Sequence, residues 1–243
     1  LVTGTSASQV VSVNGTYSFV ITDNADNVTT KSITVGNIEG IDPTGTLTQT
    51  PTGATNGNVT LNLATIADTG GSGYYRTQLP NGTYVTTTSA SHVVTVNGTY
   101  SFVIYDNAGN STTKSITVSN IDKTAPIGTL SQTPITWTNG NVTLDLTSIT
   151  DTGGSGLDNI QLPNGTYVTG TTASYPVSAN GTYSFVIYDN AGNSTTKSIT
   201  VSNIDKTLPS GTLTASTSAW TNQDVTLNLT AVTDSGGSGL KNI

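Results

Sequence analysis

The stretch Asn-Gly-Thr-Tyr-Ser-Phe-Val occupies residues 14–20 and returns unchanged at residues 97–103 and 180–186. Each copy therefore begins 83 residues after the previous one. Within the stretch the two aromatic residues stand two positions apart with a serine between them, which is the spacing of a strand with one buried face. A fixed sequence period of this kind indicates a chain built from repeated structural units.

The length of the period indicates what each unit is. Eighty-three residues are enough for one small sandwich with its own core, whereas solenoid repeats are shorter and depend on their neighbours. Each boundary is placed at a junction containing proline, which cannot donate to a β-ladder. The predicted organisation is the C-terminal part of one repeat, two whole repeats and the N-terminal part of another, at residues 1–37, 38–120, 121–203 and 204–243.

Composition and pattern favour an all-β protein. Only 33% of the residues are hydrophobic, and apolar residues nowhere recur at the helical period of 3.6 over ten or more positions. Between residues 121 and 203, alternating strand signals and turn clusters predict seven strands. The clearest turns are the Asn-Gly pair at 164–165 and the hairpin at 189–193, in which Gly192 supplies a positive φ. We therefore expect serial antiparallel β-sandwiches of about seven strands each.

Charge and hydropathy exclude several classes of partner. The net charge is −7, and no basic stripe is present that could neutralise a phosphate backbone, so nucleic acid is not expected as a partner. No apolar run reaches the roughly 18 residues of a membrane-spanning helix, so no membrane insertion is expected in this segment. Because cysteine is absent, we expect the sandwich cores to supply the stability that disulfides give to many extracellular modules.

Three motifs together carry a family resemblance. They are Asp-Lys-Thr-x-Pro junctions at 122–126 and 205–209, the Asn-Gly-Thr-Tyr-Ser-Phe-Val strands, and Asp-Asn-Ala-Gly-Asn hairpins at 106–110 and 189–193. The combination resembles the bacterial immunoglobulin-like tandem repeats of large surface adhesins and secreted multidomain proteins, and the resemblance covers the whole chain. It implies an immunoglobulin-like fold and an extracellular location, at the cell surface or secreted.

The resemblance also assigns a role to one tyrosine in each copy. Tyr17, Tyr100 and Tyr183 stand where that fold has its tyrosine corner, near the start of the penultimate strand. The first copy departs from the pattern, because Asp26 stands at the position of the hairpin glycine and its junction lacks Lys-Thr.

Carboxylates gather near the ends of the repeats. A hairpin, the following junction and the next loop contribute Asp106, Asp122 and Asp151, and 83 residues later Asp189, Asp205 and Asp234. Ca²⁺ takes hard oxygen ligands of this kind, and the resemblance also implies calcium at the junctions. Calcium is therefore the one cofactor that the sequence suggests. In the alternative interpretation, these residues accept hydrogen bonds from the amides of their own turns.

No catalytic site is expected. The Asp-Thr-Gly triplets at 68–70 and 151–153 resemble those of aspartic proteases, in which two neighbouring carboxylates share a proton, but here they lie a whole repeat apart. The single histidine, His92, corresponds to Tyr175 in the next repeat, so no pair of a nucleophile and a histidine recurs.

The sequence favours a structural stalk or fibre segment of an extracellular bacterial surface protein. Residues 97–121 and 180–204 are identical, whereas the loops of a binding site would be expected to diverge. The end segments 1–37 and 204–243 are complementary parts of one repeat. The expected partners are therefore neighbouring repeats of the same or an identical chain in a head-to-tail fibre.

Two alternatives remain open at the level of sequence. One is a carbohydrate- or matrix-binding adhesin module, in which aromatic rings stack on host or matrix glycans; the candidate rings are Tyr84, Tyr167, Trp137 and Trp220. The other is an accessory module of a secreted enzyme, which would differ only in the flanking sequence. Asn-x-Thr triplets at Asn14, Asn97 and Asn180 would be glycan acceptors in a eukaryotic secreted protein, but here the abundance of Asn and Thr accounts for them.

Overall fold

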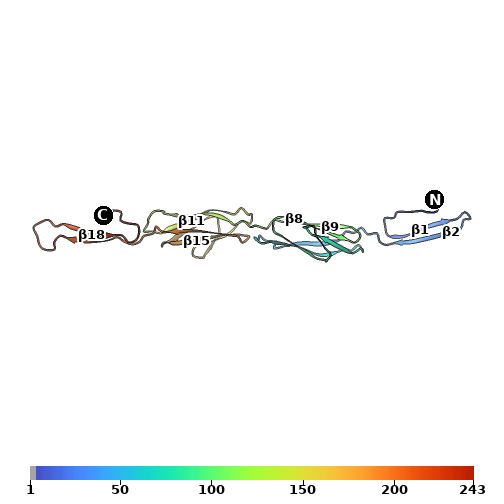
Figure 1. The fold of residues 1–243 in the computed structure, drawn as a ribbon, viewed down its shortest axis with the longest axis horizontal. Helices are drawn as coiled ribbons and strands as arrows, with labels where there is room; N and C mark the ends of the chain where they lie inside the picture. Colours follow the sequence, from blue (N-terminus) through green and yellow to red (C-terminus); the bar gives the residue numbers. More distant parts are fainter. Residues whose placement is uncertain (1–3) are drawn as a thin grey trace. The chain divides into compact units, whose positions relative to one another are not determined.

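The computed structural model describes residues 4–243, and these residues form β-strands and connecting segments without a helix (Figure 1). The first three residues of the expected segment 1–37 lie outside the described residues. In the described part of the chain, no helix is long and apolar enough to cross a membrane. The chain divides into two compact units, residues up to 52 together with 58–121, and residues 53–57 together with 122–243.

From residue 4 onward, the first unit contains nine strands in three antiparallel sheets. The strands are β1 (Gly15–Thr22), β2 (Val28–Val35), β3 (Thr44–Thr50), β4 (Val59–Ala67), β5 (Tyr74–Gln78), β6 (Tyr84–Val85), β7 (Ala90–Val94), β8 (Gly98–Asp106) and β9 (Ser111–Val118). The sheet orders are β1-β2, β3-β4-β7 and β6-β5-β8-β9.

The second unit has the same organisation in its central part. Its strands are β10 (Ile127–Thr133), β11 (Val142–Thr150), β12 (Leu157–Gln161), β13 (Tyr167–Val168), β14 (Ala173–Val177), β15 (Gly181–Asp189), β16 (Ser194–Val201), β17 (Ser210–Ala215) and β18 (Leu227–Thr233). The sheet orders are β10-β11-β14, β13-β12-β15-β16 and β17-β18. The seven strands predicted between residues 121 and 203 are confirmed as β10 to β16.

Alternation along the strands builds the core between the three-stranded and four-stranded sheets. Val142, Leu144 and Leu146 point inward from β11, and Phe185 and Ile187 meet them from β15. All five side chains are fully buried, and burial of each stabilises the fold by about 1.5–3 kcal/mol relative to exposure. The first unit has an equivalent core 83 positions earlier. Each of these sandwiches therefore has its own apolar interior.

The hairpins between the last two strands have the backbone conformation that the sequence predicts. Gly192 has a φ of 91° and Gly109 a φ of 99°, a region that costs a residue with a Cβ about 1–2 kcal/mol. In the first copy Asp26 adopts a φ of 61° at the corresponding position. Asp is among the residues that tolerate this region best, so the turn is kept although its glycine is absent.

The three expected corner tyrosines make the same hydrogen bond. The Tyr183 hydroxyl donates to the carbonyl of Ala179 at 2.8 Å, and the Tyr100 hydroxyl donates to the carbonyl of Val96 at 2.8 Å. The Tyr17 hydroxyl donates in the same way to a backbone carbonyl four residues upstream. A tyrosine that bonds back to the preceding backbone near the start of the penultimate strand is the geometry of a tyrosine corner.

The two-stranded sheets β1-β2 and β17-β18 have uncovered apolar faces. Phe19 of β1 is 42% exposed, whereas its counterpart Phe102 is fully buried. Leu229 of β18 is 47% exposed, whereas its counterpart Leu146 is fully buried. Residues that form the core in the complete sandwiches therefore form surface in these two sheets.

Candidate functional site

One asparagine side chain holds the backbone at the start of each junction. Asn180 Nδ2 donates to the carbonyl of Ile204 at 2.8 Å, and Asn180 Oδ1 accepts from the Ile204 amide at 2.9 Å. The same pair of bonds recurs in the earlier copies, between Asn97 and Ile121 and between Asn14 and Ile38. We call this arrangement the asparagine clamp. Because it satisfies both backbone groups of one residue, the junction cannot rotate there without losing both bonds.

Sequence reasoning missed the clamp. It treated these three asparagines as triplets that arise from composition, whereas the structure gives each one a defined partner 24 residues later. A signal was present, because an isoleucine stands at that distance in all three copies.

A short backbone pairing holds the next residues of the same junction. The Thr138 amide donates to the Asn203 carbonyl at 2.9 Å, and the Asp205 amide donates to the Thr138 carbonyl at 2.8 Å. Thr138 and Ile204 thereby form a parallel bridge. The Asn203 side chain also donates to two backbone carbonyls of the 134–136 loop. Three consecutive junction residues are thus hydrogen-bonded to the repeat that precedes them.

The junction aspartate, Asp205, contacts the segment that follows the junction. Asp205 Oδ1 accepts from the Thr207 amide at 2.9 Å, and Asp205 Oδ2 accepts from the Ser238 amide at 3.1 Å. Hydrogen bonds from the Ser238 side chain and from these two amides lower the pKa of Asp205 below its ordinary value. The carboxylate is therefore ionised at neutral pH, and it connects the junction to the loop of the following segment.

Asp122 makes equivalent contacts at the earlier junction. Its carboxylate accepts from the amides of Thr124 and Ser155, both at 2.9 Å. Burial raises the pKa of Asp122, but hydrogen bonds from Ser155 and Thr124 outweigh burial, so the pKa lies below its ordinary value. The Asp122 carbonyl also accepts from Asn193 Nδ2 at 2.9 Å, which ties the junction to the β15-β16 hairpin.

Two groups of three carboxylates lie near the starts of the complete sandwiches, and their composition differs from the expected grouping. Oxygen atoms within each group lie within 4.8 Å of one another; the groups are Glu39, Asp68 and Asp106 in the first unit, and Asp122, Asp151 and Asp189 in the second. The sequence grouped Asp106 with Asp122 and Asp151, and it did not include Glu39. The grouping is wrong because the hairpin of a sandwich lies next to the junction that enters that same sandwich.

We call the second group the second-unit carboxylate cluster, and its members are held by turn amides. Asp151 accepts from the amides of Gly153 and Gly156 at 3.0 and 2.8 Å. Asp189 accepts from the backbone amide and the side-chain amide of Asn193, both at 2.7 Å. Turn capping therefore describes these carboxylates. Their all-oxygen donor set also fits a hard divalent cation such as Ca²⁺.

The remaining two candidate carboxylates follow the same pattern. Asp234 accepts from the amides of Gly236 and Gly239 at 3.2 and 2.7 Å, as Asp151 does one repeat earlier. Asp205 stands beside this loop through its bond to Ser238. The Ser238 hydroxyl donates to Asp234 at 3.1 Å, so Ser238 connects these two carboxylates.

The two tryptophans differ in their surroundings. Trp137 is 48% exposed and lines an open groove of about 520 Å³ at the junction, together with Lys206, Leu208 and Pro209. Trp220 is fully exposed. Trp137 therefore lies against the junction, and Trp220 does not pack in the described chain.

The two candidate tyrosines lie on the outer surface of the four-stranded sheets. Tyr84 is 46% exposed and Tyr167 is 58% exposed. Each has a second tyrosine beside it, with 6.4 Å between the ring centroids of Tyr84 and Tyr105 and 6.3 Å between those of Tyr167 and Tyr188. These rings are accessible to a ligand.

Comparison with protein-family models and with curated proteins finds no relative of this chain. No protein-family model matches the chain, and no curated protein matches it. The repeats, the junction contacts and the exposed surfaces are therefore the observations that bear on function.

Proposed function

We propose that this chain is a non-catalytic structural segment of an extracellular bacterial stalk or fibre, built from tandem immunoglobulin-like repeats. The observation that carries the proposal is the bonding of residues 203–205. The asparagine clamp and Thr138 hold these residues on one side, and Asp205 reaches Ser238 on the other. A linker that is hydrogen-bonded on both of its sides resists bending, which a load-bearing stalk requires.

The cores of the repeats support the same proposal. In each complete sandwich the apolar residues of both sheets are buried within that sandwich, so each repeat can bear load without relying on a large surface of its neighbour. The identity of residues 97–121 and 180–204 also fits a repeated structural part.

Calcium binding at the carboxylate groups would change the stiffness of the junction. Asp122, Asp151 and Asp189 come from the junction, a loop and a hairpin, so they belong to the parts that would move if the junction bent. Bound there, Ca²⁺ would neutralise three neighbouring carboxylates and tie these three parts together.

The proposed partner is a neighbouring repeat of the same or an identical chain, arranged head to tail. The uncovered face of β1-β2 corresponds to β8-β9 and β15-β16, and the uncovered face of β17-β18 corresponds to β3-β4 and β10-β11. In the complete sandwiches these two kinds of strand pair cover each other's apolar residues. Joining β17-β18 to a β1-β2 pair would therefore remove both exposed faces from water.

Single-molecule force extension tests the stalk proposal. Each complete repeat of 83 residues should release roughly 270–300 Å of chain in one step. The unfolding force of the 121–203 repeat should fall in Asn180→Ala, which removes one clamp, and stay unchanged in Asn222→Ala on the exposed surface. Repeats that unfold at low force, with no difference between the two variants, would argue against a load-bearing role.

Glycan or matrix binding is a second candidate function. The exposed rings of Tyr84 and Tyr167 support it, and neither ring is needed to close a core.

A further inference from the structure

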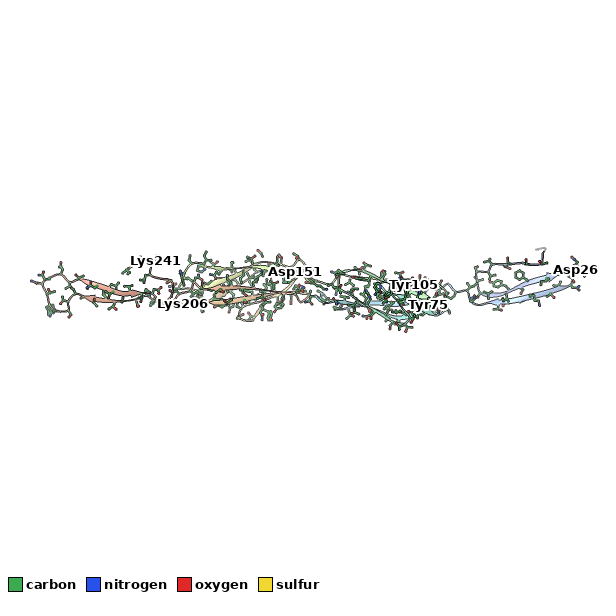
Figure 2. The ribbon with its side chains drawn as sticks, in the orientation of Figure 1. Asp26, Tyr75, Tyr105, Asp151, Lys206 and Lys241 are labelled. Carbon is green, nitrogen blue, oxygen red and sulfur yellow. The ribbon has the colours of Figure 1, made fainter. Side chains whose placement is uncertain are left out.

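The only arginine of the chain stands among three tyrosine rings. The Arg76 guanidinium carbon lies 4.1 Å from the ring centroid of Tyr84, 5.0 Å from that of Tyr75 and 5.5 Å from that of Tyr105; Figure 2 labels Tyr75 and Tyr105. All three distances are within the roughly 6 Å over which a cation is attracted to a ring face. We call these four residues the Arg76 cluster.

Strand pairing creates the cluster on the outer face of the sheet β6-β5-β8-β9. Arg76 on β5 stands opposite Tyr105 on β8, and Tyr84 belongs to β6 on the other side of β5. Thr77, the next residue of β5, is fully buried, so its neighbour Arg76 faces away from the core. Tyr75 lies where the β5-β8 register shifts, and it is 49% exposed.

Among residues 4–243, the Arg76 guanidinium contacts aromatic rings and pairs with no carboxylate. A guanidinium stays charged at all physiological pH values and offers five N–H donors. The Nε donor of Arg76 is buried and has no hydrogen-bond partner among the described residues. An anion from solvent therefore reaches the guanidinium through its Nη groups, which are not among the buried atoms without a partner, and a carboxylate matches the two-point geometry of a guanidinium.

The next repeat shows that the fold does not need this cluster. Tyr167 and Tyr188 keep the ring pair there, but Asp158 and Asn159 stand in place of Tyr75 and Arg76. The Asn159 side chain donates to the Asp158 carboxylate at 2.7 Å. The local charge thus differs by two units between otherwise similar surfaces, and the sandwich forms with either pair.

We propose that the Arg76 cluster binds a carboxylated sugar unit of an acidic glycan. The guanidinium binds the carboxylate through two hydrogen bonds, and the exposed Tyr84 ring stacks on the C–H face of the sugar ring. The chain has a net charge of −7 and one cation at this site. The site therefore suits binding of one carboxylate and not of the many phosphates of a nucleic acid. This inference goes beyond the structural role and does not depend on it.

The chain offers a direct spectroscopic readout, because a single arginine gives a single Arg Nε–H resonance in a nitrogen-15 spectrum. The probes are a tetramer of galacturonic acid and its fully methyl-esterified form, which has the same sugar rings without the charge. A second arm compares sialyllactose with lactose, which distinguishes an internal uronic acid from a terminal sialic acid. We expect the resonance to shift with at least one acidic probe and to stay in place with its neutral counterpart.

Calorimetry with matched variants completes the test. Arg76→Asn installs the residue of the next repeat, and the affinity for the acidic probe should fall about tenfold or more. The double variant Asp158→Tyr/Asn159→Arg copies the cluster into the next repeat, and the number of bound probes should rise from one to two. Urea melts of both variants check that the sandwiches remain folded.

Several results would overturn the proposal. They are equal binding of acidic and neutral probes, unchanged affinity in a folded Arg76→Asn variant, and no binding of any probe. A shift of the same size with acetate at matched concentration would reduce the cluster to an anion site without sugar recognition. Failure of the load-bearing test alone would leave these results unaffected, so the two proposals can be judged separately.

Discussion

Removal of the asparagine clamp is the sharpest test of how the junctions are held. Asn180→Ala deletes two hydrogen bonds of 2.8 and 2.9 Å to the backbone of Ile204, whose side chain is only 6% exposed. Each bond contributes about 0.5–1.5 kcal/mol net, and a buried backbone group left without a partner costs about 1–3 kcal/mol. We therefore expect a loss of about 2–4 kcal/mol in the free energy of unfolding of the 121–203 repeat.

Urea unfolding of the full chain, followed by circular dichroism, measures this loss. In a thermal melt, a folding unit of this size should show a melting temperature lower by about 10 °C or more. Asn97→Ala removes the equivalent clamp and should destabilise its own repeat by a similar amount. Asn222→Ala on the exposed surface should change stability by less than about 0.5 kcal/mol. A loss below about 0.5 kcal/mol in Asn180→Ala would refute the assignment of the clamp as a structural tie.

Four further outcomes are expected. Tyr183→Phe deletes the corner hydrogen bond to a backbone carbonyl and should cost about 1 kcal/mol in a urea melt; equal stability would contradict a corner role. A methyl group at Gly153 would overlap the Asp122 carboxylate, whereas Gly140 meets only Thr138 Oγ1 at 3.4 Å; Gly153→Ala should therefore cost about 1–3 kcal/mol more than Gly140→Ala. The pKa of Asp122 is lowered in the folded state, so its stabilising contribution is complete above the unfolded pKa of 3.8 and is lost as the pH falls through the folded value; urea melts at decreasing pH should show a steeper loss for the parent chain than for Asp122→Asn. Added Ca²⁺ should raise the melting temperature of the 121–203 repeat by mass action in the parent chain and not in Asp122→Asn, and an unchanged melt of that repeat in the parent would leave the second-unit carboxylate cluster as turn caps.

Features that depend on local chain chemistry could be predicted from the sequence. The period of 83 residues is visible directly as repetition of the sequence. The seven strands between 121 and 203 follow from period-two alternation, which acts over a few residues. The positive φ of Gly192 follows from the turn itself. The hydrogen bond of Tyr183 spans four residues, so a fold-level resemblance was enough to place it.

Features that depend on strand pairing could not be predicted in the same way. Proximity in sequence favoured Asp106 as the partner of Asp122, but the β15-β16 hairpin brings Asp189 to that position. The Arg76 cluster needs β6, β5 and β8 to lie side by side before its rings meet.

The sequence by itself determined the repeat, because the copies can be compared directly. It also determined the all-β class and the turns, because backbone preference and side-chain alternation are decided within a few residues. Only the tertiary structure decided which carboxylates share a site, which asparagine holds which isoleucine and which rings surround Arg76. These arrangements join residues that are far apart in the chain. Their positions depend on which strands pair and on how two sheets enclose one core, and the alternation within one strand does not specify its partner strand.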